Sequence, residues 1–178
     1  LLDRQRAVDG QLITVQGRRD VYSDLFLPLH GVHQAHNATV AIVAAEAFLG
    51  AEDKPLDQET VAEGLARVTS PGRAELVRTG PSVVVDGAHN PDAAHVLAET
   101  LTEAFDFDYV VMVLAMLADK DADGVIEELH RSADVFVVSE NLNSRALPVD
   151  DLAEAAREWV DEDSVLVASD LNAALMKA

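Results

Sequence analysis

Four short apolar runs, each followed by a segment with helical periodicity, organise the second half of the chain. Continuous apolar strands that alternate with helices are typical of a parallel sheet covered on both faces. Strands are predicted near residues 82–86, 108–115, 134–139 and 164–168, and helices over 91–104, 122–131, 149–160 and from 170 to the end. The pattern therefore predicts an α/β fold, with a doubly wound sheet in which these four strands run parallel.

The first 68 residues show a different pattern. Two segments, 11–17 and 20–29, flank a turn at 17–20 and predict a hairpin. An alanine-rich helix over about 36–49, stopped by Gly50, is apolar on nearly every face and is expected to be buried. With one more short helix over 58–68, these elements are too few for an independent core. Residues 1–68 are therefore interpreted as the end of one domain, and residues 69–178 as a second domain.

Composition narrows the classes of function. The chain holds 32 acidic and 13 basic residues, a formal net charge of −19 that disfavours nucleic acid or an anionic membrane as partners. No apolar run reaches the roughly 20 residues of a membrane span, and no signal peptide is recognised, so a cytoplasmic protein is expected. The absence of cysteine excludes disulfides and thiolate metal sites. Abundant aspartate with only three lysines favours a halophilic, salt-rich cytosol, where counter-ions screen the repulsion.

The string VVVDGAHNPDAA, residues 83–94, ends a strand on an acid and opens a helix at once. Asn90 is a natural N-cap and Pro91 a natural first helical residue, so the helix directs its partial positive end toward the rim of the sheet. In open parallel sheets, ligands bind beyond this carboxyl rim. Asp86 could accept hydrogen bonds from ribose hydroxyls there, and His89 could contact a phosphate or a carboxylate. A strand–helix turn without any ligand would show the same cap, so both interpretations stay open.

Three further polar residues are candidates for binding. Asn37 lies on the first turn of the helix expected to be buried, where its amide needs either nearby backbone or the edge of a ligand base. Arg73 follows Ser-Pro-Gly in the joint between the two parts, as an exposed charge or as an anion clamp. Lys120 comes just past the second parallel strand, where it is either solvated or a cation for an acidic substrate.

Some expected motifs are missing. The chain has neither G-x-x-x-x-G-K-[ST] nor G-x-G-x-x-G, and so no cradle of its own for the β- and γ-phosphates of a nucleotide. His30, His33 and His36 lack the partner carboxylate of a His-Glu-x-x-His site, so a zinc site is not expected.

In chain order, LPLHGVHQAHNATVAIVAAEAF, SPGRAEL, VVVDGAHNPDAA and LAMLADKDADG resemble the C-terminal part of the folylpolyglutamate synthase/dihydrofolate synthase family, in the Mur ligase superfamily. The resemblance covers roughly residues 20–140. It implies a Rossmann-like C-terminal domain over 69–178, preceded by the tail of the ATP-binding central domain over 1–68. Enzymes of this family join L-glutamate to dihydropteroate or to a folate. ATP phosphorylates the acceptor carboxylate, and the glutamate amine attacks the acyl phosphate.

The resemblance also implies roles for single residues. The adenine-contacting asparagine of the family falls on Asn37, its ATP-contacting arginine on Arg73 and its nucleotide-contacting aspartate on Asp86. The histidine near the phosphate and the incoming glutamate falls on His89. In related Mur ligases a lysine at the position of Lys120 holds the carboxylate of the amino acid. No catalytic residue is assigned, and the ligands of Mg²⁺ are expected upstream of this chain.

Departures from the family pattern suggest a fragment. The P-loop, the metal-binding glutamate and histidine, the pterin loop and the last strand with T-G-S are absent, so the chain alone is expected to be inactive. The full-length form is expected to be a monomer. One rival is a receiver-like signalling module, although a single acid follows the first strand and Ser139-Glu140 follows the third. Another is a ligase relative that binds nucleotide but has lost catalysis. The choice between dihydropteroate and a folate depends on an upstream pocket.

Overall fold

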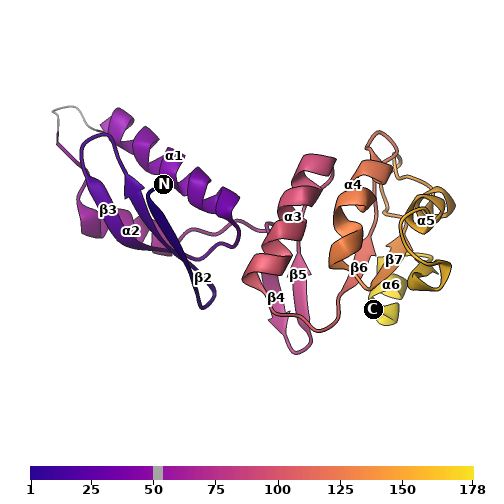
Figure 1. Ribbon diagram of the computed structural model, residues 1–178. Helices are drawn as coiled ribbons and strands as arrows, with labels where there is room; N and C mark the ends of the chain where they lie inside the picture. The colour runs from indigo at the N-terminus through magenta and orange to yellow at the C-terminus, as the bar shows by residue number, and fades with distance from the viewer. Residues whose placement is uncertain (50–53) are drawn as a thin grey trace. The chain divides into compact units, whose positions relative to one another are not determined.

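The structure is a computed structural model that describes residues 1–49 and 54–178 (Figure 1). The chain divides into two compact units, Leu1–Gly87 and Ala88–Ala178. The domain boundary expected between residues 68 and 69 stays a prediction, and the expected helix stop at Gly50 lies outside the described residues. Among the residues that the structure describes, no helix is long and apolar enough to cross a membrane.

The core of the first unit lies between an antiparallel sheet and two helices. The sheet has the order β1 (Asp3–Ala7), β2 (Gly10–Gln16) and β3 (Val21–Leu27), and the helices are α1 (Val32–Leu49) and α2 (Gln58–Ala66). The hairpin predicted over 11–29 is confirmed as the pair β2–β3. Apolar residues of these elements share one buried cluster: Ile13, Val15, Tyr22, Leu25, Leu27, Ala35, Ala38, Ile42, Val61 and Leu65.

Helix α1 begins four residues earlier than predicted, and it is not buried on all sides. Ala35, Ala38 and Ile42 pack in the core, whereas Val40 is 68% exposed and Phe48 is 88% exposed. The expectation of a helix buried on every face is therefore wrong for the described residues. The physical reason is that one sheet can cover only one side of the helix. We call the uncovered stripe, Val40, Ala41, Ala44 and Phe48, the α1 outer face.

The strand predicted over 82–86 has a different partner from the one expected. β5 (Ser82–Val85) pairs antiparallel with β4 (Glu75–Thr79) in a two-stranded sheet of the first unit. The expectation that it runs parallel to the other three strands is wrong. Only Gly80 and Pro81 connect β4 to β5, and so short a connection permits an antiparallel pair but not a parallel one.

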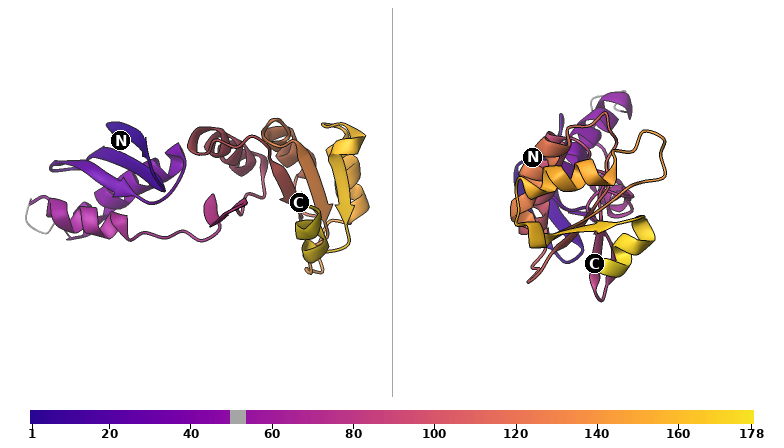
Figure 2. Two further views of the ribbon diagram at one scale, coloured as in Figure 1. Left: turned by 90° about the horizontal axis from the view of Figure 1, so that it is seen from below. Right: turned by 90° about the vertical axis from the view of Figure 1, so that its right-hand side faces the viewer.

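The second unit is an α/β layer structure. Its parallel sheet has the order β6 (Val111–Leu114), β7 (Val135–Ser139) and β8 (Val165–Ala168). Its helices are α3 (Pro91–Ala104), α4 (Ala122–Leu129), α5 (Val149–Arg157) and α6 (Leu171–Lys177), with short 3₁₀ turns at His130–Ser132 and Glu162–Ser164. Phe136 and Val138 face α3, α4 and α5, and Val137 on the opposite face packs with Ala174 of α6 (Figures 1 and 2). Helices on both faces of a parallel sheet confirm the predicted fold class.

Side-chain caps fix where the helices of the second unit begin. The Asn90 side chain accepts a hydrogen bond from the Ala93 N–H (2.8 Å), and Pro91 is the first residue of α3, as predicted. Asp121 caps α4 in the same way, through the Gly124 N–H (3.0 Å). Helix α3 therefore begins shortly after β5, and α4 begins shortly after β6. Three of the five predicted site residues lie in these two connections.

Candidate functional site

The first group of candidate residues surrounds a strained loop in the first unit, residues 70–75, which we call the Arg73 loop. Both neighbours of Arg73 have left-handed backbone, with φ of +69° at Gly72 and +45° at Ala74. Two hydrogen bonds fasten the loop to the end of β5: the Ala74 N–H donates to Asp86 Oδ2 (2.7 Å), and the Gly87 N–H donates to the Gly72 carbonyl (2.9 Å). Asp86 therefore holds the loop that carries Arg73.

His33, on the first turn of α1, belongs to the same group. Burial lowers its pKa, the nearby Asp86 carboxylate opposes this shift, and the Arg73 guanidinium adds to it. Its Nδ1 atom is buried and has no hydrogen-bond partner among the described residues. From the sequence, His33 was a candidate only as a metal ligand. Its spacing of four residues from Asn37 was a usable signal that both residues share one side of a helix.

Asn37 is exposed, contrary to the expectation of a buried amide. The cause is the open outer side of α1. Its Nδ2 donates a long hydrogen bond of 3.4 Å to Gln34 Oε1, a partner on the same helix. The Asn37 amide is therefore open to solvent, with one weak partner on its own helix.

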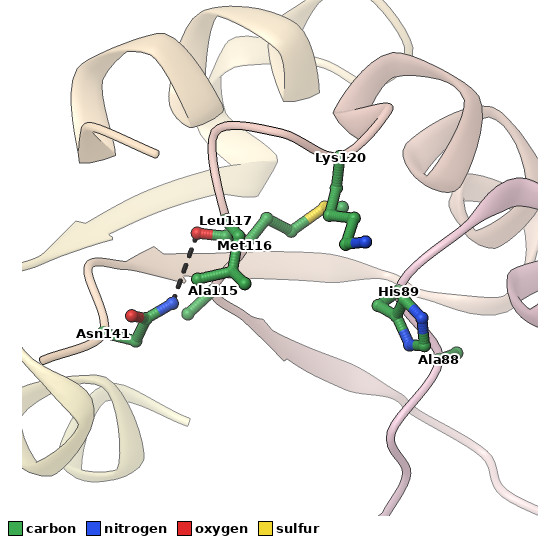
Figure 3. A pocket seen from close by; sticks show the side chains of 7 residues that line it. All are labelled: Ala88, His89, Ala115, Met116, Leu117, Lys120 and Asn141. Carbon is green, nitrogen blue, oxygen red and sulfur yellow. Dashed lines mark hydrogen bonds between the residues drawn. The ribbon is translucent and has the colours of Figure 1, made fainter. Parts of the chain in front are cut away.

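The second group lines a pocket of about 330 Å³ in the second unit (Figure 3). The pocket opens at the carboxyl ends of β6 and β7, the rim where the alternating pattern predicts ligand binding. It is lined by Ala88, His89, Ala115, Met116, Leu117, Lys120 and Asn141. Figure 3 shows the Lys120 amine on the same side as the His89 ring, with Asn141 at the opposite end. The structure therefore brings His89 and Lys120 to one pocket.

Backbone pairing fixes the loop that carries Lys120. The Met116 carbonyl accepts hydrogen bonds from the Leu147 N–H (2.9 Å) and from Asn141 Nδ2 (3.2 Å). The Ala118 N–H donates to the Arg145 carbonyl (2.8 Å). Sequence reasoning missed Asn141, although a polar residue two positions after the end of β7 lies at the same rim and was a usable signal.

Lys120 is paired weakly enough to exchange its partner. Its amine lies 3.5 Å from Asp119 Oδ2, and the Arg145 guanidinium lies 3.6 Å from Asp119 Oδ1. These side chains are between 33% and 65% exposed, and ion pairs in water contribute little net free energy. A carboxylate ligand in the pocket can therefore replace Asp119 as the partner of Lys120.

Four of the five predicted site residues thus fall into two groups. Arg73 and Asp86 lie close together in the first unit with His33 nearby, and His89 and Lys120 line one pocket in the second. The fifth, Asn37, lies exposed on α1, where its side chain bonds to Gln34. Within 1–49 and 54–178, no three histidine, aspartate or glutamate side chains are grouped so that they could hold a metal ion. The first group offers a guanidinium and a carboxylate, and the second offers an amine and an imidazole, which suit a polar ligand and an anionic one.

Comparisons of the sequence and of the structure with known proteins agree on one family. The profile described as "Mur ligase, glutamate ligase domain" matches residues 72–178. The dihydrofolate synthase/folylpolyglutamate synthase of Mycobacterium tuberculosis is 49% identical over 176 residues. That match covers 98% of this chain but 36% of the relative, so the chain spans little more than a third of the relative's length.

Solved structures agree with this match. Mycobacterium tuberculosis folylpolyglutamate synthase complexed with ADP has a TM-score of 0.95 at 49% identity, covering 99% of this chain and 39% of that one. The bifunctional folylpolyglutamate synthase/dihydrofolate synthase of Yersinia pestis, complexed with AMPPNP and a Mn ion, has a TM-score of 0.66 at 30% identity. It covers 85% of this chain and 34% of that one.

Proposed function

The chain belongs to the Mur ligase family, and on that premise we propose that it serves an ATP-dependent ligase that joins L-glutamate to dihydropteroate, to a folate or to both. The observation that carries the proposal is the string D-G-A-H-N-P. It supplies Asp86 to the group around Arg73 and His89 to the pocket that holds Lys120. One short segment thus contributes to a polar group and to a cationic pocket.

We assign the group around Arg73 to the nucleotide. The relatives are solved with ADP and with AMPPNP, which supports a nucleotide ligand for this chain. The Arg73 guanidinium suits a phosphate, because its planar fork matches the oxygen geometry. The Asp86 carboxylate accepts a hydrogen bond from the Ala74 N–H, and a carboxylate is a suitable acceptor for ribose hydroxyls. Asn37 can present its amide to the edge of adenine.

We assign the pocket at the rim of β6 and β7 to L-glutamate. Its carboxylate replaces Asp119 beside the Lys120 amine, and His89 supplies a second polar contact. In the reaction, an oxygen of the acceptor carboxylate first attacks the γ-phosphorus of ATP, the bond to the β-phosphate breaks, and ADP leaves, which gives an acyl phosphate. The lone pair of the glutamate nitrogen then attacks the acyl carbon, inorganic phosphate leaves with the bonding electrons, and the nitrogen loses a proton. The role of this chain is to hold the two substrates.

A divalent cation does not fit the residues described here, since they offer no group of three suitable ligands. The Mn ion of the Yersinia pestis relative supports use of a divalent metal by the full-length enzyme. We place Mg²⁺ and its ligands, together with the P-loop, in the part of the relatives that this chain does not match. The chain alone is then expected to be inactive.

The α1 outer face supports the assignment of residues 1–68 to the tail of a larger ATP-binding domain. A stripe of valine, alanine and phenylalanine without charge is unusual on a protein of net charge −19. Covering by further residues of that domain explains it. The cytoplasmic location and the monomeric full-length form stay predictions from the sequence. The comparisons do not favour the receiver-like alternative.

The test is a product assay on the full-length protein. With ATP and radiolabelled L-glutamate, we expect label to enter dihydropteroate or a folate, with one ADP formed per glutamate joined. Supplying the two acceptors separately decides between them. A protein that binds ADP but incorporates no label with either acceptor would be the relative that has lost catalysis, and the proposed activity would be wrong.

A further inference from the structure

We propose that Gly87 is a positioning residue for Arg73: because Gly87 has no side chain, the Arg73 guanidinium can lie directly over the backbone at the end of β5. The inference rests on the proposed role of Arg73 in binding ATP, and it explains how this arginine is aimed. The glycine of the D-G-A-H-N-P string is thus required because a larger residue would occupy the space of the guanidinium.

The space above Gly87 is occupied by the guanidinium. A Cβ atom added at Gly87 would lie 2.9 Å from Arg73 Nη1 and 3.9 Å from Arg73 Cζ. A real Cβ contact is essentially never shorter than 3.0 Å, so the guanidinium must shift. Among the described glycines, only Gly31 and Gly72 have a positive φ, so the backbone at Gly87 suits any residue. Glycine is required here for close approach, not for its backbone freedom.

Hydrogen bonds hold the backbone of the Arg73 loop, so the guanidinium is presented from a fixed position. Besides the bonds to Asp86 and Gly87, the Gly72 N–H donates to Glu75 Oε2 (2.8 Å), and the Arg73 N–H donates to the Ser70 carbonyl (3.2 Å). Ala74 keeps a left-handed backbone and is only 3% exposed. Because these hydrogen bonds hold the backbone of the loop, we expect a side chain at residue 87 to displace the end of the Arg73 side chain and not the backbone of Arg73.

Gly87→Ala should therefore act like a partial loss of Arg73 without unfolding the protein. The atom that must move is the far end of a flexible side chain, and the next neighbour, the Gly72 carbonyl oxygen, lies at an ordinary 3.5 Å from the added Cβ. We expect the melting temperature to be unchanged. We expect the KM for ATP to rise several-fold, and the KM for glutamate to stay the same.

A double-mutant cycle in the full-length enzyme tests the inference. The variants are Gly87→Ala, Arg73→Ala, the double variant, and Gly64→Ala as a matched control, since an added Cβ at Gly64 meets nothing within 4 Å. Arg73→Ala should raise the KM for ATP about tenfold, the effect of losing one charge-assisted hydrogen bond. The double variant should be no worse than Arg73→Ala, because coupled residues are not additive.

Each outcome is decisive. If Arg73→Ala raises the KM for ATP and Gly87→Ala does not, or if the two effects multiply, the positioning role is wrong while the nucleotide role of Arg73 stands. If Arg73→Ala has no effect, the nucleotide role fails, and a crystal structure of Gly87→Ala decides the rest: an undisplaced guanidinium would overturn the inference. Should Gly87→Ala fold poorly, the defect must disappear in the double variant, because Arg73→Ala empties the space; a defect that persists contradicts us.

Discussion

A single buried carboxylate connects three parts of the first unit. Glu46, only 4% exposed, accepts hydrogen bonds from the Tyr22 hydroxyl (2.7 Å) and from the Arg18 N–H. The Tyr22 hydroxyl in turn accepts a hydrogen bond from the Leu56 N–H (2.9 Å). Burial alone would raise the pKa of Glu46, but these donors outweigh it and lower the pKa below its ordinary value. Burial and the bond to Glu46 raise the pKa of Tyr22 to about 12.

This carboxylate makes stability depend on acidity. Because its folded pKa is depressed, Glu46 stabilises the fold above the unfolded pKa of about 4.3, and the contribution is lost as the pH falls through the folded pKa. Glu46→Gln should lower the free energy of unfolding by about 2 kcal/mol at pH 7, and by less at lower pH. Tyr22→Phe, the matched control, should cost about 1 kcal/mol at pH 7. Urea unfolding measures both; a Glu46→Gln loss that does not shrink in acid would contradict the account.

At the scale of elements, helix starts could be predicted from the sequence because a cap is written in one or two residues. Asn90-Pro91 fixes the start of α3 to the residue. Strand pairing has a local signal only where a short turn joins the two strands, as in the β2–β3 hairpin and at Gly80-Pro81 between β4 and β5, and the second of these turns was overlooked. The valines of β5 suit either a parallel or an antiparallel partner, and β1, with the sequence DRQRA, has no apolar pattern and was missed.

The features of the candidate site likewise divide into those that the sequence could predict and those that depend on the three-dimensional structure. Lys120 could be found because it follows β6, an apolar strand of the parallel sheet, and ligands bind at this end of open sheets. The same reasoning was wrong for Asp86, because β5 before it pairs antiparallel with β4 in the first unit and does not end at the rim of the parallel sheet. The steric role of Gly87 could not be predicted, because it depends on where the Arg73 guanidinium lies in space. The exposure of Asn37 depends equally on how much of α1 the sheet covers.

The close approach of α3 and α4 gives a prediction at this scale. A Cβ added at Gly124 would lie 2.6 Å from Asp121 Oδ2, the cap of α4, and 2.7 Å from Pro91 Cγ, at the start of α3. Gly124→Ala should therefore destabilise the protein by about 1–3 kcal/mol through overpacking. Gly64→Ala, in the open interior of α2, should instead stabilise it by up to about 1 kcal/mol. Thermal melting compares them, and equal effects would refute the proposed contact.

At the scale of the whole molecule, the net charge of −19 should dominate the response to salt. The Debye length is about 30 Å at 0.01 M and about 3 Å at 1 M, so molar KCl removes most repulsion between distant carboxylates. The melting temperature should rise steeply from low to molar salt, without the plateau near 0.15 M expected of an ordinary acidic protein. A melting temperature that does not change over this range would show that the aspartates only solubilise the protein, and the inference of a salt-rich cytosol would be wrong.

The central claim is that the rim pocket of the second unit holds the incoming glutamate. The most direct measurement is the KM for glutamate of Lys120→Ala in the full-length enzyme, with the KM for ATP measured in parallel. Removing a charge-assisted contact should raise the KM for glutamate about tenfold or more and leave the KM for ATP unchanged. Lys54→Ala, which removes the same charge from an exposed position of the first unit, should change neither. An unchanged KM for glutamate in Lys120→Ala would contradict the account.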